Sequence, residues 1–272
     1  MTDGLAGEPR ILRLQVIGGG KMGEALLGGL VADGWATADQ LHVVEPDGDR
    51  RAVLAGALPG VSVGDSAVAG VDTLVAVKPH VVADVCAGLA ALGVPRVLSI
   101  AAGVTTAAME AALGSGVPVV RVMPNTPSLV GQGAAAVAGG NAATPADLDW
   151  AAGVLGAVGE VVVVEEVLID AVTGLSGSGP AYVFLLAEAL MAAGIAEGLP
   201  ADVAVTLTEQ TLLGAATLLK ASDDPPAILR ENVTSKGGTT AAGLAVFEAA
   251  GFRDLVADVV AAAAARSREL GA

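Results

Sequence analysis

The sequence predicts an α/β protein in two parts: an N-terminal, mostly parallel sheet with helices, and a C-terminal part made of helices alone. In residues 1–165, short β-branched runs alternate with Ala-rich helical stretches, which is typical of right-handed strand–helix–strand crossovers. After residue 165, no strand-like run appears again. The 272 residues, 53% of them hydrophobic and 16% charged, are enough for two domains, expected at 1–165 and 166–272.

The elements of the first part follow from the spacing of its β-branched runs. Helices are expected between successive strands and on both faces of a doubly wound sheet. One further helix is expected to begin at Thr144, because this capping residue precedes Pro145 and an acid at Asp147. The expected strands are 11–17, 41–45, 73–77, 96–100, 117–123, 133–138 and 158–164, and the other expected helices are 22–33, 50–58, 82–91 and 106–113.

The second part is predicted to be a helical oligomerisation domain. Its helices are expected over residues 182–197, 201–220, 226–231, 240–250 and 252–270. They are apolar on more than one face, as the set Leu207, Leu212, Leu213, Leu218 and Leu219 illustrates. A small helical domain cannot bury all of these side chains, so a second subunit is expected to cover them. The alternative is that they pack against the first domain.

Composition excludes several classes of protein. Fourteen Lys and Arg residues against 29 Asp and Glu give a net charge of -15, and no basic run marks a nucleic-acid binder. The single cysteine, Cys86, cannot form an internal disulfide, and a cytoplasmic protein is expected. The longest uncharged segment, residues 122–146, is broken by prolines and glycines, so no membrane span is expected. Two histidines and one cysteine form no metal-ligand pattern.

A glycine motif predicts a dinucleotide site. Gly18, Gly20 and Gly23 have the GxGxxG spacing, with Lys21 and Met22 inside the motif, directly after a strand and at the start of a helix. Gly18 would permit the tight turn, Gly20 the close approach of the pyrophosphate, and Gly23 the packing of helix on strand. The positive helix start would bind the phosphates in spite of the acidic chain. An ordinary strand–helix turn is the alternative reading.

Further cofactor contacts are expected where other strands end. Glu45 ends the second strand, where an acid usually holds the ribose hydroxyls of NAD and repels the extra phosphate of NADP. Arg50 and Arg51 could offset this repulsion, so the choice between NADPH and NADH stays open. The loops carrying Val77, Lys78 and Pro79 and carrying Ala101 and Ala102 follow later strands, and small residues would let a nicotinamide lie close to the backbone. For His80 a surface or helix-capping role is favoured over acid–base chemistry.

Five segments resemble the pyrroline-5-carboxylate reductases in order and spacing: residues 18–23, 76–79, 121–127, 170–182 and 234–240. The resemblance runs from about Ile11 to Leu270, and the segments Ser-Gly-Ser-Gly-Pro-Ala-Tyr and Gly-Gly-Thr-Thr are the most specific. It implies reduction of 1-pyrroline-5-carboxylate to proline, usually with NADPH, on a Rossmann-type domain followed by a helical domain that interlocks two chains. It also implies an active site at the dimer interface, and in some members a ring of dimers.

The resemblance assigns site residues position by position. Asn232, Thr239 and Thr240 match a loop that touches cofactor and substrate, and Ser235 matches a serine of that loop. Glu166 matches an acid near the substrate, whereas Val77, Lys78, Pro79 and Ala102 match cofactor contacts.

The chain departs from the family pattern at three places. Lys236 replaces a usual Pro, Gly64 or Asp65 replaces a frequent Asn, and Glu45 replaces a small polar residue that suits the NADP phosphate.

The chemistry expected at this loop is the reduction of a cyclic imine. The cofactor transfers a hydride to the C=N carbon, and the protein holds the two rings together. Gly237 and Gly238 expose backbone N–H groups at a positive helix start, which suits the substrate carboxylate, although plain capping by Thr239 is the alternative. Thr240 is the candidate catalytic residue, a hydroxyl that orients the imine nitrogen. Lys236 either strengthens carboxylate binding or is a solvated loop residue.

Two other functions remain open at this stage. A related reductase could act on another imine or on a β-hydroxyacid, but the latter requires a catalytic lysine on an interdomain helix, and Lys220 and Lys236 fit that role poorly. A regulatory protein could bind NAD(P)H without turnover. The intact Gly-Gly-Thr-Thr segment argues against it, because such a sensor needs no substrate cradle.

Overall fold

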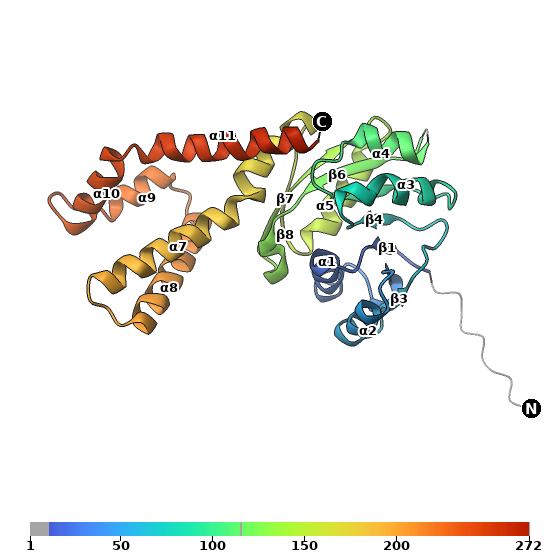
Figure 1. Ribbon diagram of the computed structural model, residues 1–272, viewed down its shortest axis with the longest axis horizontal. Coiled ribbons are helices and arrows are strands. Elements are labelled where there is room, and N and C mark those ends of the chain that lie inside the picture. The colour runs from blue at the N-terminus through green and yellow to red at the C-terminus, as the bar shows by residue number, and fades with distance from the viewer. Residues whose placement is uncertain (1–10, 115, 272) are drawn as a thin grey trace, which may run out of the picture. The chain divides into compact units, whose positions relative to one another are not determined.

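The computed structural model describes residues 11–114 and 116–271, so the first ten residues of the predicted domain 1–165 lie outside the described part. The chain forms two compact units. The first unit extends to Gly177 and also takes in the residues from Ala263 onward, and the second unit comprises Ser178–Ala262. Figure 1 shows strands and helices in the first unit and helices alone in the second.

The first unit is built on an eight-stranded sheet with the order β3-β2-β1-β4-β5-β6-β7-β8. All neighbouring strands are parallel except β6 and β7, which are antiparallel. The strands are β1 (Leu14–Ile17), β2 (Leu41–Val44), β3 (Ser62–Gly64), β4 (Thr73–Val75), β5 (Val97–Ser99), β6 (Val119–Met123), β7 (Gly133–Gly139) and β8 (Gly159–Val163). The predicted α/β sheet is therefore confirmed.

Strand β3 corrects the sequence prediction, which placed no strand there. Three residues that end in glycine give no recognisable alternation, and pairing with β2 is what orders them. His42 lies opposite Ser62 in this pairing, and their Nδ1 and Oγ atoms are 3.0 Å apart.

Helices cover both faces of the sheet, as predicted for a doubly wound fold (Figure 1). One face packs against α1 (Lys21–Ala32), α2 (Gly48–Ala57) and α5 (Pro145–Gly156) through buried leucines. The opposite face packs against α3 (Val82–Ala90) and α4 (Thr106–Leu113) through a cluster rich in valine. Strands β1, β2, β4 and β5 are buried on both faces, which explains why they read as continuous apolar runs. The short helices η1 (Ala38–Gln40), η2 (Pro79–Val81) and η3 (Thr126–Val130) lie in connections.

The predicted start of α5 is confirmed by its capping box. The Asp147 carboxylate accepts hydrogen bonds from the Thr144 backbone N–H at 2.9 Å and from its hydroxyl at 2.6 Å. Arg96 lies 3.4 Å from the same carboxylate and pairs with Asp72 at 2.8 Å. Asp147 thereby satisfies both donors of the cap residue Thr144.

The segment between the sheet and the long helices is a second correction, because no element was predicted there. It forms η4 (Glu166–Leu168), α6 (Ile169–Val172) and a π-helical turn, η5 (Thr173–Gly177). A side chain on Gly177 would lie 2.3 Å from Cε of Met123, and Ile169 is buried against Ala136 and Ala138. These contacts attach the segment to the sheet, so the first compact unit extends to Gly177.

The second unit contains α7 (Gly179–Ala196), α8 (Ala201–Ala221), α9 (Pro226–Asn232), α10 (Thr239–Ala249) and the first part of α11 (Phe252–Leu270). These match the five predicted helices, except that α7 begins three residues before Tyr182. The rest of α11 belongs to the first unit, where the Ser267 hydroxyl donates to Asp170 at 2.6 Å. No strand follows β8 in the described chain.

Many apolar side chains of the second unit are exposed in the single chain. They include Phe184, Leu185, Leu207, Leu213, Val246 and Leu255. Among the described residues, one continuous helical run, Glu166–Ala196, is also long and apolar enough to cross a bilayer by length and composition alone. No span was predicted from the sequence, and this run contains the acids Glu166, Asp170 and Glu188.

Candidate functional site

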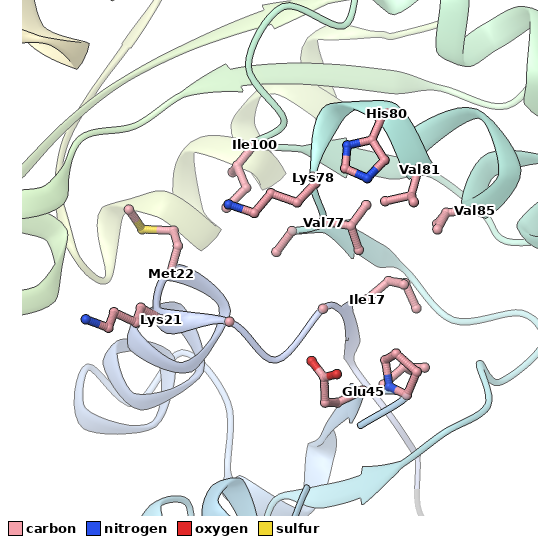
Figure 2. A pocket seen from close by; sticks show the side chains of 15 residues that line it. Ile17, Lys21, Met22, Glu45, Val77, Lys78, His80, Val81, Val85 and Ile100 are labelled. Carbon is pink, nitrogen blue, oxygen red and sulfur yellow. The ribbon is translucent and has the colours of Figure 1, made fainter. Parts of the chain in front are cut away.

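A cleft of about 860 Å³ opens at the carboxyl ends of the central strands of the first unit. Figure 2 shows it with Lys21 and Met22 from α1, Glu45 from the end of β2, and Lys78 and Ile100 from the loops after β4 and β5. Ligands bind at this edge in doubly wound sheets, next to the strand where the order reverses. Seven predicted cofactor residues line the cleft: Gly18, Gly20, Lys21, Met22, Glu45, Val77 and Lys78.

The three glycines of the motif have the geometries expected for them. Gly18 has φ +108°, and a Cβ there would lie 2.6 Å from the carbonyl oxygen of Ala76. A Cβ on Gly23 would lie 2.3 Å from the carbonyl oxygen of Gly18, so Gly23 does not line the cleft but permits the helix to pack. A Cβ on Gly20 would meet nothing within 4 Å. The backbone at Gly20 is therefore open to the cleft.

The start of α1 can bind an anion, because no side chain of the chain caps it. Gly20 is the N-cap of this 12-residue helix and has no side chain to bond the first-turn N–H groups. These free donors and the helix dipole favour a phosphate at this point. The residues present thus fit the pyrophosphate of a dinucleotide, as the sequence predicted.

Glu45 lies beside the glycine turn and is bound to it. Its Oε2 accepts a hydrogen bond from the Gly19 N–H at 2.9 Å, and its Oε1 accepts one from the Asp47 N–H at 3.0 Å. A Cβ on Gly19 would lie 3.2 Å from this carboxylate and 2.3 Å from Leu54, so the residue between the first two motif glycines must also be small. No role was predicted for Gly19, since the motif pattern allows any residue at that position.

The remaining predicted cofactor residues of the first unit lie beside the cleft rather than in its lining. Pro79 begins η2 with Lys78 as its N-cap, Ala101 is buried, and Ala102 is exposed. His80 also lines the cleft, whereas a surface or capping role was favoured from the sequence. Figure 2 shows its ring above Val77 and Val81.

The predicted substrate loop lies in the second unit, together with Asn232, the last residue of α9. The Gly238 N–H donates to the Ser235 carbonyl at 3.0 Å, and Gly237 has φ +73°. A positive φ at the third position of such a turn is typical of type II, which strongly favours glycine there and often has proline at the second position. Lys236 occupies that second position.

This turn leads into α10, whose N-cap is Gly238, with no side-chain cap. The first-turn N–H groups at Thr239 and Thr240 are therefore available to an anion. Both threonines are exposed in the single chain, and no hydrogen bond of the Thr240 hydroxyl occurs within the described residues. The arrangement has the free donors that a carboxylate needs, but lacks a wall to enclose a substrate.

Glu166, predicted as an acid near the substrate, has both carboxylate oxygens engaged within the first unit. They accept hydrogen bonds from the Thr106 N–H at 2.7 Å and the Thr106 hydroxyl at 2.6 Å. The Arg121 guanidinium lies 3.3 Å away and its side chain is only 7% exposed. Glu166 therefore binds the first residue of α4, beside the cap residue Thr105, and neutralises a buried cation.

Asn125 has a positioning role that the sequence analysis did not assign. Its amide accepts a hydrogen bond from the Ala134 N–H at 2.9 Å and donates one to the Ser176 carbonyl at 3.1 Å. It thus joins strand β7 to the π-helical turn, and such turns are frequent at functional sites. Its place in the segment 121–127 was the available signal.

The described residues contain no cluster of three or more His, Cys, Asp or Glu side chains that could hold a metal ion. Burial raises the pKa of the Cys86 thiol to about 11, so this cysteine is a core residue and not a nucleophile.

Comparisons with known proteins give one consistent answer. The family model "Pyrroline-5-carboxylate reductase dimerisation" matches residues 166–270, and the model "NADP oxidoreductase coenzyme F420-dependent" matches residues 13–103. The pyrroline-5-carboxylate reductase of Synechocystis is 44% identical over 96% of this chain and 98% of its own length. The one from Pseudomonas aeruginosa is 44% identical over 95% and 96%.

The fold of this chain is also similar to solved structures of pyrroline-5-carboxylate reductases. A pyrroline-5-carboxylate reductase from Coxiella burnetii has a TM-score of 0.89 and 35% identity, covering 96% of this chain and 99% of its own. The enzyme from Plasmodium falciparum, solved with NADP bound, has a TM-score of 0.82 and 28% identity, covering 97% and 100%.

Proposed function

The chain belongs to the pyrroline-5-carboxylate reductase family, and from this premise we propose that it reduces 1-pyrroline-5-carboxylate to L-proline with NADPH or NADH. The observation that carries the proposal is that both halves of the required site are intact. The first unit has an open glycine turn at the end of a parallel strand, and the second has an uncapped helix start after a glycine turn.

The cleft of the first unit would bind the dinucleotide. Its pyrophosphate fits the free N–H groups at the start of α1, with Lys21 beside them. Lys78 and Ile100 lie at the end of the cleft away from Glu45, where the nicotinamide would lie (Figure 2). We propose that Pro79, Ala101, Ala102 and Asn232 contact the cofactor in the assembled enzyme, since in the single chain they do not line the cleft.

The loop before α10 would bind the substrate. The backbone N–H groups at Thr239 and Thr240 suit the carboxylate, while Ser235, Gly237 and Gly238 shape the turn that presents them. For Glu166 we propose a supporting role, because the described contacts of its carboxylate are with Thr106 and Arg121.

In the reaction, bound NAD(P)H supplies the hydride that the imine carbon receives. The chain's own residues have to fix the substrate ring against the cofactor and keep its nitrogen protonated. The Thr240 hydroxyl is suited to hydrogen-bond this nitrogen and pass a proton to it, although a hydroxyl is a weak acid. Its lack of a partner within the described residues leaves it available for this role.

We further propose that the second unit forms a homodimer, which can associate further into a ring, and that the enzyme is cytoplasmic. The exposed apolar side chains of α7, α8 and α10 require a cover, and the matching family model is named for dimerisation. In such a dimer the cleft of one chain would be completed by the loop before α10 of its partner.

Turnover is tested with purified protein and 1-pyrroline-5-carboxylate, following the absorbance of NADPH and NADH in separate reactions. Oxidation of either cofactor together with formation of proline supports the proposal. A protein that binds NADH or NADPH but consumes neither with this substrate would be the non-catalytic alternative. Consumption only with a β-hydroxyacid product would point to the other reductase.

The shared site is tested by mixing two defective chains. Gly18→Ala places a Cβ against the Ala76 carbonyl and damages the cleft, whereas Thr240→Ala damages the loop. If each site combines two chains, refolding an equal mixture restores about a quarter of wild-type activity, because half of the dimers then hold one intact site. If each site lies within one chain, mixing restores nothing. The activity of each separate variant is the control.

A further inference from the structure

We infer that the Glu45 end of the cleft selects NADH over NADPH. This inference deepens the proposed function, since it assumes that the dinucleotide binds in this cleft, with its adenosine ribose at the end of β2. Figure 2 shows the Glu45 carboxylate beside the glycine turn, on the far side of that turn from Lys78. The charge at this end of the cleft is therefore set by Glu45 and its neighbours.

The Glu45 carboxylate is fixed in position. The N–H groups of Gly19 and Asp47 each donate to one of its oxygens, at 2.9 Å and 3.0 Å. Each carboxylate oxygen can accept a second hydrogen bond, so two lone-pair directions remain for the vicinal hydroxyls of a ribose. A 2′-phosphate offers this carboxylate further negative charge and no good donor.

The two nearby arginines do not supply a phosphate site. The Arg50 guanidinium donates to the Gly19 carbonyl at 2.7 Å and pairs with Glu24 at 2.5 Å. Arg51 donates to the carbonyls of Glu45 and Pro46, each at 2.8 Å. Neither lines the cleft. A phosphate would have to break these bonds before either cation could reach it.

The start of α2 is closed to a phosphate as well. The Asp47 carboxylate accepts a hydrogen bond from the Arg50 N–H at 2.9 Å and so caps the helix itself. The positive helix end that would attract a 2′-phosphate is thus satisfied by a carboxylate of the chain.

The test measures binding of NADH and of NADPH to the full-length protein by isothermal titration calorimetry, without imine substrate. We expect NADH to bind at least about 10-fold more tightly than NADPH. Glu45→Gln keeps a side-chain oxygen for the Gly19 N–H but removes the charge. In this variant the NADPH affinity is expected to rise and the preference for NADH to fall about 5-fold or more.

Asp49→Asn is the matched control, because it removes one negative charge from an exposed position four residues away. It should leave the ratio of the two affinities nearly unchanged. Binding of 5′-ADP against 2′,5′-ADP to the wild-type protein isolates the adenosine end, and the same preference is expected there.

Three results would overturn the inference: NADPH binding as tightly as NADH to the wild-type protein, an unchanged ratio in a folded Glu45→Gln variant, or an equal shift in Asp49→Asn. The outcome is separable from the proposed function. Equal or tighter NADPH binding in a protein that reduces the imine refutes only the cofactor preference, whereas a clear preference for NADH without any reduction of the imine refutes only the reductase.

Discussion

The carboxylate of Glu166 lies 2.7 Å from the backbone N–H of Thr106 and accepts its hydrogen bond, although the two residues are 60 positions apart. The contact ties the segment that leaves β8 to the start of α4. Because the same carboxylate faces the buried Arg121, removal of Glu166 would leave both an unbonded Thr106 N–H and an unpaired buried cation.

Glu166→Ala should therefore destabilise the protein more than it alters substrate binding. We expect the free energy of unfolding to fall by about 2–4 kcal/mol, from the lost charged hydrogen bonds and the unpaired Arg121. Urea denaturation followed by circular dichroism measures it. The neighbouring exposed Glu165→Ala should change stability by less than about 0.5 kcal/mol. Unchanged stability in Glu166→Ala, with a raised KM, would instead indicate direct contact with substrate.

Thr240→Ala should lower kcat/KM by about 10-fold to a few hundred-fold, equivalent to one lost hydrogen bond of about 1.5–3 kcal/mol in the transition state. The hydroxyl has no partner within the described residues, so its loss should leave stability nearly unchanged. Steady-state kinetics and thermal unfolding test the two statements together.

Thr240→Ser is the matched control for this substitution, because it keeps the hydroxyl and removes only a methyl group. Its kcat/KM should stay within about 5-fold of wild type. If both variants turn over substrate at the wild-type rate, Thr240 takes no part in the mechanism.

The sequence predicts most of the fold because its signals are local. The glycine motif, the β-branched runs and the Thr144–Asp147 capping box each depend on residues that are neighbours in the chain. The three residues of β3 could not be predicted in this way, since β2 orders them through pairing across the sheet.

The helical turns between Glu166 and Gly177 were missed for a related reason. A run of Gly and Ser favours a loop by intrinsic propensity. The structure overrides this preference through Met123, which fills the space beside Gly177, and through Asn125, which holds the Ser176 carbonyl. Both partners are about 50 residues away in the chain. The Thr106 partner of Glu166 is 60 residues away, so local sequence patterns could not reveal this contact either.

Lys236→Pro should stabilise the turn before α10. Lys236 is the second residue of a turn that has its positive φ at Gly237, and proline is favoured at that position. We expect the free energy of unfolding to rise by about 0.4–1 kcal/mol, because proline restricts the unfolded chain. Chemical denaturation tests this expectation.

The same variant decides whether the Lys236 charge assists substrate binding. If the ammonium attracts the substrate carboxylate, Lys236→Pro should raise KM at low ionic strength and less so at high ionic strength. If Lys236 is a solvated turn residue, KM should be unchanged at both. A fall in stability would contradict the assignment of the turn.

Asp147→Asn should reveal a stabilising contribution that depends on pH. Burial opposes ionisation of Asp147, but hydrogen bonds from Thr144 and the Arg96 guanidinium outweigh it and lower its pKa below the ordinary value of 3.8. An acid whose folded pKa is lowered stabilises the protein fully above its unfolded pKa, and this stabilisation disappears as the pH falls through the folded pKa.

The free energy of unfolding of the wild-type protein should therefore exceed that of the Asp147→Asn variant by about 1–2 kcal/mol at pH 7, and the difference should shrink steadily below about pH 4. Urea denaturation at several pH values measures it, with the exposed Asp149→Asn as control. A difference that persists unchanged down to pH 2 would mean that the geometry of the capping box, and not the charge of Asp147, stabilises the start of α5.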